Sequence, residues 1–360
     1  MEILVLPGDG IGPEITEATV AATEALNRKF SLALQLRQRK IGLESLATCG
    51  TTLPEDIIRQ ALSADGVILG PVSSYSYPPP GQGGINPSAE IRSRLDLYAN
   101  IRPCYARSEI SPFAANMDLV IVRENTEGFY AARSMVAGSG EFMPSIETAF
   151  AIRKVTAVAS QRIAIKAFEL ARQRRRKVTV VHKANVLRLS DGLFLREVRN
   201  VADKYPDVDL EEVLVDAMAA LLIRQPDRFD VILTTNMFGD ILSDEAAELC
   251  GGLGLAASLN MGDEYAVAQA VHGSAPDIAG QNRANPTALM LSVAMLLDWL
   301  NIRHQRTSFS DAAMCLRTAI NRLIAEPANR TADLGGCLST SSFGRIVADK
   351  ITEMKPIALR

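Results

Sequence analysis

The feature that most constrains the fold is a repeated pairing of a short apolar run with a helix-length amphipathic segment. The runs are EILVLP (2–7), GVILGP (66–71), LVIVREN (119–125), VTVVHKAN (178–185) and DVILTTN (230–236). Apolar runs of this length that alternate with helical segments are typical of βα units, in which the strands lie parallel. The pattern therefore predicts an α/β protein with a largely parallel sheet.

Three of these runs end in polar residues that include an asparagine. They are Arg123, Glu124 and Asn125; His182, Lys183 and Asn185; and Asn236, which is followed by Asp240. Because ligands of open parallel sheets bind outside the carboxyl ends of the strands, these side chains could converge on one site. Ordinary loop starts would have the same composition, so both interpretations stay open at this point.

Two acidic residues follow the last run. Asp240 and Asp244 lie four residues apart in NMFGDILSDEAAEL (236–249), which has helical spacing. At this spacing the two carboxylates lie on one face of a helix and repel each other. A solvated acidic face has this pattern, and so does a pair of ligands for a divalent cation.

The glycine-rich stretch PGDGIGPE (7–14) invites comparison with a dinucleotide-binding loop. Its glycines alternate, whereas the Rossmann fingerprint reads G-x-G-x-x-G and has an acid about 20 residues further on. The stretch NRKFSLALQLRQRK (27–40) holds no acidic residue. We therefore expect a tight turn with its backbone close to a ligand, and not the Rossmann dinucleotide-binding fold.

Composition narrows the class of protein. The 360 residues are 48% hydrophobic, with a net charge of −3, which suits a large core and gives no basic excess for nucleic acid. The basic run RQRRRK (172–177) is interpreted as a surface turn at a helix end. Five scattered cysteines and the absence of a signal-like start or a membrane-length apolar stretch lead us to expect a cytoplasmic protein with no membrane partner.

Basic side chains could match the acids. Arg92, Arg94 and Arg102 lie in AEIRSRLDLYANIRP (89–103), and Arg123 ends an apolar run. Arginine forms bidentate bonds with carboxylates. Together with the aspartates and a lysine, these residues suit a small polycarboxylate substrate held beside Mg²⁺ or Mn²⁺.

The chain resembles the isocitrate/3-isopropylmalate dehydrogenase family, the metal-dependent β-decarboxylating dehydrogenases. The motifs that carry the resemblance are PGDGIGPE, RLDLYANIRP, VRENTEGFY, HKANVLRLSDGLF, TTNMFGDILSDEAAEL, HGSAPDIAGQNRANPTALMLS and TADLGG. They occur in the expected order and span nearly the whole chain. The resemblance implies two doubly wound α/β domains that flank an active-site cleft. We expect a discontinuous cofactor-binding domain from residues 1–99 and 252–360, and a smaller dimerisation and substrate/metal domain from residues 100–251.

The resemblance also implies a role for each matching residue. Tyr130 would be the general acid and Lys183 the base. Asp240 and Asp244, with Asp216 from the other subunit, would hold the metal, and Lys183 would likewise act across a homodimer with shared active sites. The substrate-binding residues would be Ser88, Arg92, Arg102, Arg123 and Asn185. The cofactor-binding residues would be His272, Gly273, Ser274, Ala275, Asp277, Ile278 and Asn285.

The reaction that the resemblance implies is an oxidative decarboxylation. Hydride would leave C2 of a 3-substituted (R)-malate, and loss of the β-carboxylate as CO₂ would give a 2-oxo acid. A divalent ion on the C2 oxygen stabilises the charge in both steps. Asp277 stands where NAD-linked relatives place an acid, and NADP-linked relatives carry lysine and tyrosine in place of Asp277 and Ile278. We therefore expect NAD.

The identity of the substrate is narrowed by three positions. The 3-isopropylmalate branch has leucine where this chain has Ser88, and it reads ELTGG where this chain reads ENTEG; tartrate and D-malate relatives read TKSN where this chain reads HKAN. Polar Ser88 and Asn86 favour isocitrate or homoisocitrate. The alternatives are 3-isopropylmalate, tartrate or D-malate, and a non-catalytic regulatory subunit, although the catalytic set is present.

Two departures from the family pattern stand out. Gln269 in AQAVHG replaces an acid close to the cofactor, and the segment 133–150, where the family has its intersubunit arm, matches no branch. The Pro- and Gly-rich loop 74–84 is expected to be mobile and to reshape the pocket.

Overall fold

The chain forms two compact units. The computed structural model describes residues 1–107, 109–111, 116–130 and 140–354. The first unit comprises residues 1–95, 251–259 and 264–360, and the second comprises residues 96–250 and 260–263. The second unit therefore also includes a short segment from beyond the predicted boundary at residue 251.

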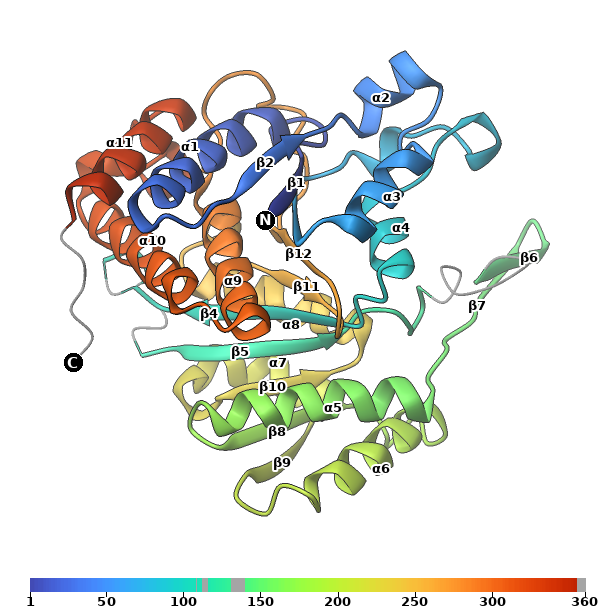
Figure 1. Cartoon of the computed structure of the whole chain (residues 1–360). Coiled ribbons are helices and arrows are strands. Elements are labelled where there is room, and N and C mark those ends of the chain that lie inside the picture. Colours follow the sequence, from blue (N-terminus) through green and yellow to red (C-terminus); the bar gives the residue numbers. More distant parts are fainter. Residues whose placement is uncertain (108, 112–115, 131–139, 355–360) are drawn as a thin grey trace. The chain divides into compact units, whose positions relative to one another are not determined.

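The first unit contains four parallel strands in the order β2, β1, β3 and β12. These are β1 (Glu2–Leu6), β2 (Gln35–Gln38), β3 (Gly66–Leu69) and β12 (Ala266–Gln269). Its helices are α1 (Gly12–Phe30), α2 (Gly42–Cys49), α3 (Glu55–Ser63), α4 (Pro87–Arg94), α9 (Thr287–His304), α10 (Thr307–Ala325) and α11 (Thr340–Glu353). Figure 1 shows α1, α10 and α11 side by side, and α1 packs against α11.

The loop 74–84 contains more regular secondary structure than the sequence suggested. It contains two short 3₁₀ helices, Ser74–Ser76 and Pro80–Gln82, and α4 begins at Pro87. Pro87 suits the first helical turn, where its missing N–H would have no partner. The side chain of Asn86 caps this helix by accepting a hydrogen bond from the amide of Ala89.

The second unit contains a five-stranded stretch of sheet in the order β4, β5, β10, β8 and β9. Its strands are β4 (Ala99–Tyr105), β5 (Asp118–Glu124), β8 (Lys177–His182), β9 (Asp209–Leu214) and β10 (Val231–Thr234). All neighbours are parallel except β4 and β5. Its helices are α5 (Ala157–Arg172), α6 (Ser190–Ala202), α7 (Val215–Arg224) and α8 (Asn236–Leu249). The short strand β11 (Leu259–Met261) crosses the boundary between the units in sequence.

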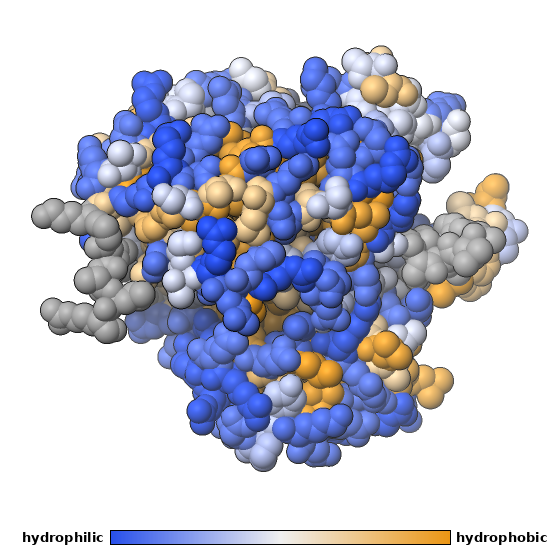
Figure 2. Space-filling view, in the orientation of Figure 1, coloured by the Kyte–Doolittle hydropathy of each residue, from blue (hydrophilic) through white to orange (hydrophobic). Residues whose placement is uncertain are grey.

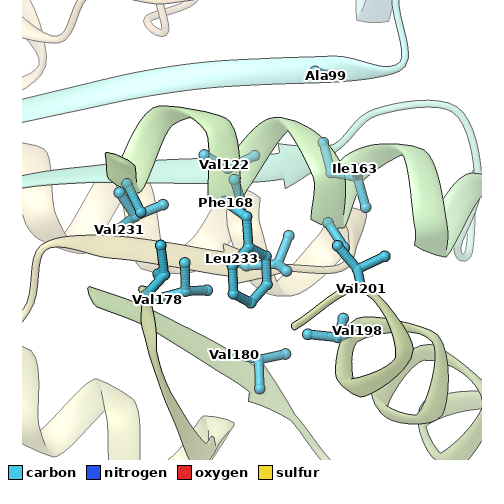
Figure 3. Packing of buried hydrophobic residues seen from close by; sticks show 14 of the residues in the cluster. Ala99, Val122, Ile163, Phe168, Val178, Val180, Val198, Val201, Val231 and Leu233 are labelled. Atoms are coloured by element: carbon cyan, nitrogen blue, oxygen red, sulfur yellow. The ribbon is translucent and has the colours of Figure 1, made fainter. Parts of the chain in front are cut away.

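Burial on both faces explains why β5, β8 and β10 of the second unit are largely apolar. Val120 and Val122 of β5 join a core with α5 and α6, whereas Ile121 joins a second core with α7 and α8. Successive strand residues point to opposite faces, so both sets must be apolar when helices cover both. Figure 3 shows Phe168 of α5 in the first of these cores, between Val122 and Leu233.

The predicted α/β class and all five predicted strands are confirmed. The prediction of a surface turn at the basic run also agrees with the structure. Arg172 pairs with Asp207, while Arg174 and Arg175 lie near Asp118 and Asp230. The positive charge of this run is therefore offset by neighbouring acids.

One element of the second unit is exposed. Residues 133–139 of the arm segment lie outside the described residues, and the remainder forms a hairpin of β6 (Glu141–Ser145) and β7 (Thr148–Ala151). Phe142 stacks on Phe150 with ring centroids 5.2 Å apart, and both side chains are exposed. Figure 2 shows hydrophobic residues gathered on this projection, at the right of the view.

Candidate active site

Three parallel strands of the second unit end side by side. β10 lies between β5 and β8, and Thr234 is in register with Arg123 on one side and Val181 on the other. The residues that follow these positions therefore leave the sheet at one edge. This edge carries the polar tips noted in the sequence.

A cluster of two arginines and two aspartates lies at this edge. The Arg123 side chain is 3% exposed, forms an ion pair with Asp240, and donates two hydrogen bonds to Asn236 Oδ1 at 3.0 and 2.7 Å. The Arg102 side chain is 6% exposed, and its guanidinium lies 3.2 Å from Asp240 Oδ1 and 3.5 Å from Asp244 Oδ1. Asp240 is thus shared by two buried cations that come from adjacent strands.

The two aspartates remain open to solvent on one side. The side chains of Asp240 and Asp244 are 39% and 52% exposed. Burial raises the pKa of Asp244; Arg102 opposes this rise, and the charge of Asp240 adds to it. Both carboxylates are therefore accessible to solvent on one side, and on the other side they contact the buried guanidinium groups of the two arginines.

The two arginines place opposite charge beside the aspartate pair. Two half-exposed carboxylates one helical turn apart still supply hard oxygen ligands of the kind that Mg²⁺ and Mn²⁺ take. Within the ranges that the structure describes, no three His, Cys, Asp or Glu side chains form a metal site.

The residues predicted to be the base and the third metal ligand lie together. Lys183 Nζ forms an ion pair with Asp216, which stands in the first turn of α7. This hydrogen bond holds the pKa of the exposed Asp216 carboxyl below its ordinary value. The roles of Lys183 and Asp216 across a dimer stay predictions.

Two further predicted residues lie near the strand ends. Asn185 is exposed on the loop after β8, and Tyr130 is half-buried in a turn after β5. This turn is fixed because Gly128 and Lys154 exchange two backbone hydrogen bonds, of 2.8 and 3.0 Å. Tyr130 is thereby held two residues from an anchored position.

In the first unit, the two predicted substrate-binding residues share one partner. Ser88 and Arg92 of α4 both donate to Gln269 Oε1 of β12, at 3.0 and 3.3 Å. Ser88 and Gln269 are buried. Gln269, which departs from the family pattern, therefore contacts both predicted substrate-binding residues directly.

The predicted cofactor segment packs against the glycine-rich loop. The amide of Ile11 donates to the carbonyl of Ser274 at 2.9 Å, and Ser73 donates to Ser274 Oγ at 2.8 Å. A Cβ atom on Gly10 would lie 2.0 Å from the Ser274 carbonyl oxygen, so only glycine fits there. The backbone of the glycine-rich loop therefore lies close to the segment that would hold the cofactor.

The other predicted cofactor residues lie along the same segment. His272 and Ile278 are half-buried, Gly273 and Asp277 are exposed, and Ala275 has a positive φ of 37°. Burial lowers the pKa of His272, so its ring is neutral near pH 7. Asn285 is buried and donates to Asp333 at 2.9 Å.

Sequence reasoning missed several polar residues that organise these sites. Glu14 accepts hydrogen bonds from the amides of Asn282 and Ala284, each at 3.1 Å, and so holds the end of the cofactor segment. Asp9 accepts from the amides of Leu43 and Ser73, at 2.7 and 2.9 Å. Both acids lie in PGDGIGPE, and their position in that motif was the only available signal.

No helix in the described part of the chain has the length and apolar character needed to cross a membrane.

Comparison with known proteins identifies the family. The sequence model described as isocitrate/isopropylmalate dehydrogenase matches residues 2–347. The homoisocitrate dehydrogenase of Methanocaldococcus jannaschii is 41% identical, with 96% of each chain covered. The 3-isopropylmalate dehydrogenase of Saccharolobus solfataricus is 41% identical, with 93% of this chain and 94% of the relative covered. A crystal structure of isocitrate dehydrogenase from Methylococcus capsulatus is similar with a TM-score of 0.86 and 37% identity, and covers 98% of this chain and 99% of that one. The chain therefore belongs to the isocitrate/isopropylmalate dehydrogenase family.

Proposed function

We propose that this protein oxidises and decarboxylates a 3-substituted (R)-malate with NAD, and that isocitrate or homoisocitrate is the favoured substrate. The observation that carries the proposal is the pair of buried arginines, Arg102 and Arg123, set behind the half-exposed Asp240 and Asp244. The two arginines and the two aspartates together have a net charge of zero. A bound divalent cation would leave the cluster positive, and so suited to a polycarboxylate.

Each residue has a proposed chemical task. Asp240 and Asp244 would hold Mg²⁺ or Mn²⁺, while Arg102 and Arg123 would exchange their aspartate contacts for substrate carboxylates. Lys183 would take the proton of the 2-hydroxyl, and Tyr130 would return a proton to the carbon that loses CO₂. When bound, NAD accepts the hydride, and the divalent ion stabilises negative charge on the C2 oxygen.

The preference for a polar substituent rests on α4. Ser88, Arg92 and Gln269 form a hydrogen-bonded polar group. An isopropyl substituent packed against this group would exclude water from its hydrogen-bonding atoms and offer no hydrogen bond in return. The side-chain oxygen of Asn86 is already used as a helix cap, so we do not assign Asn86 to the substrate. The names of the relatives include homoisocitrate and 3-isopropylmalate dehydrogenases, which makes 3-isopropylmalate the second candidate.

NAD is the proposed cofactor because of Asp277. Its exposed carboxylate can accept hydrogen bonds from ribose hydroxyls and would repel the 2′-phosphate of NADP.

A substrate panel tests the proposal. Isocitrate, homoisocitrate, 3-isopropylmalate, D-malate and tartrate are each offered with Mn²⁺ and either NAD or NADP, and reduced cofactor is followed by absorbance. We expect turnover with NAD and with isocitrate or homoisocitrate, and none from the Lys183→Ala variant. Faster turnover of 3-isopropylmalate would favour the second candidate, and no turnover of any acid would favour a non-catalytic relative.

We further propose a homodimer whose two active sites are shared. Large apolar side chains lie exposed close in sequence to the proposed catalytic and metal-binding residues. They are Val186 and Leu189 near Lys183, Ile223 on the helix of Asp216, and Ile241 beside Asp240. An exposed set of this kind is typical of a surface that a second chain covers.

A further inference from the structure

A buried ion pair in the second unit links the elements that carry the proposed chemistry. The Arg153 side chain is 9% exposed, and its Nη1 lies 2.5 Å from Oδ1 of Asp191, which is fully buried. The other carboxylate oxygen of Asp191 accepts a hydrogen bond of 2.6 Å from the backbone amide of Lys183. Arg153 thus reaches the backbone of Lys183 through a single side chain.

The same guanidinium also reaches the helix that bears the two aspartates. Arg153 Nη1 donates to Ser190 Oγ at 2.8 Å, and Nη2 donates to Thr235 Oγ1 at 3.2 Å. Thr235 is the N-cap residue of α8, but its hydroxyl makes no capping hydrogen bond. The hydroxyl accepts from Arg153 instead, which ties the start of α8 to the first turn of α6.

Arg153 is itself fixed by the turn that precedes Tyr130. Its neighbour Lys154 exchanges two backbone hydrogen bonds with Gly128. The guanidinium carbon lies 5.9 Å from the ring centroid of Phe129 and 5.6 Å from that of Phe238 in the first turn of α8. Both distances are within the range of a cation–π contact.

We propose that Arg153 is a positioning residue, which sets the backbone of Lys183 and the first turn of α8 at fixed places relative to the turn of Tyr130. The catalytic importance of Arg153 rests on the proposed function. That function makes Lys183 the base, gives α8 the metal ligands, and makes Tyr130 the acid. Arginine is needed because its planar fork can reach Asp191, Ser190 and Thr235 at once, whereas a lysine ammonium is a single point.

The test compares substitutions that keep charge with substitutions that remove one contact. Arg153→Lys keeps the ion pair with Asp191, and Thr235→Val removes only the hydroxyl that accepts from Arg153. We expect each to lower kcat about 10- to 100-fold, with KM within about threefold, because small displacements of reacting groups cost this much. Thr235→Ser retains the hydroxyl and should restore kcat. Arg172→Gln, which removes an exposed arginine–aspartate pair in the same unit, is the matched control and should leave kcat unchanged.

Folding is separated from positioning by two measurements. Thermal unfolding should place Thr235→Val close to wild type, so that its loss of kcat does not follow a loss of stability. Hydrogen exchange should be faster in residues 183–187 and 236–240 of Arg153→Lys, with residues 194–201 of α6 unchanged. Values of kcat within about twofold of wild type for both Arg153→Lys and Thr235→Val would overturn the proposal.

The exchange measurement also separates this inference from the proposed function. If the wild type turns over none of the five acids, the proposed function fails. Faster hydrogen exchange confined to residues 183–187 and 236–240 of Arg153→Lys would still support Arg153 as the residue that positions these segments. Exchange that rises uniformly across the second unit, or does not change, overturns the positioning role whether or not the wild type is active.

Discussion

At the residue scale, the most consequential feature is the unequal environment of Asp240 and Asp244. Asp240 contacts both buried arginines, whereas Asp244 lies 3.5 Å from one of them and is more exposed. A buried guanidinium that loses its counter-charge keeps its desolvation cost and loses the attraction that offset it. The two acids should therefore differ in their effect on stability, although both are proposed to bind the same ion.

This difference gives a prediction for the pair of isosteric variants. Asp240→Asn should lower the free energy of unfolding by about 1–3 kcal/mol, since it leaves two buried cations poorly compensated. Asp244→Asn should cost less than about 1 kcal/mol, as for an exposed ion pair. Urea unfolding without added metal measures both. Equal losses of unfolding free energy in the two variants would contradict this account. Both variants should also bind Mn²⁺ more weakly than the wild type.

Gln269 gives a second prediction at this scale. In Gln269→Glu, a carboxylate would pair with Arg92 and compete with the substrate for that guanidinium. We expect KM for the acid substrate to rise about tenfold, the effect of losing one charged contact, with a smaller change in kcat. Steady-state kinetics measure this, and Gln38→Glu on the exposed edge of β2 is the charge-matched control. An unchanged KM would exclude Arg92 from substrate binding.

Residue roles could be proposed only where local sequence carries them. Asp240, Lys183 and Ser274 lie in long motifs, so the resemblance assigned them roles. The contacts of Arg123 with Asp240 and of Arg153 with Thr235 join residues 117 and 82 positions apart. No local pattern encodes such pairs, and they arise from the order of β5, β10 and β8 in the sheet.

At the element scale, the five strands that were predicted share a largely buried, apolar character. The predicted strands β1, β3, β5, β8 and β10 are apolar along their length, because helices cover both faces. The strands β2 (QLRQ) and β9 (DLEEVL) were missed, since exposed edge strands carry polar residues that resemble loops. β4 was missed as well, and its antiparallel pairing with β5 is the exception to the parallel arrangement within the second unit's stretch of sheet.

The core between α5 and the sheet gives an element-scale prediction. Phe168 is fully buried among Val122, Val178 and Leu233. Phe168→Ala should lower the free energy of unfolding by about 3–5 kcal/mol through lost burial and the cavity left behind. Denaturant unfolding measures the change, and Tyr75→Ala, at a fully exposed position of the first unit, should stay within about 0.5 kcal/mol. A small loss for Phe168→Ala would mean that the strands and α5 repack around the gap.

At the scale of the whole molecule, the proposed base, the proposed metal ligands and two proposed substrate-binding arginines all belong to one unit. Lys183 and Asp216 pair with each other, and Asp240 and Asp244 pair with Arg102 and Arg123, although all six belong to the second unit. In the proposed homodimer, these two groups would be half-sites that one chain presents on one unit. A second copy related by a twofold axis could bring each half-site against the other, and would do so twice.

Mixed dimers test this arrangement directly. Lys183→Ala and Asp240→Ala chains are each expected to be inactive alone. If each site takes Lys183 from one chain and Asp240 from the other, a mixed dimer holds one intact site and one site that lacks both residues. Random mixing makes about half the dimers mixed, so activity should recover to about one quarter of wild type. If both residues of a site came from the same chain, both sites of a mixed dimer would be defective. Activity that stays at zero after verified subunit exchange would therefore refute shared sites, while leaving the roles of the individual residues intact.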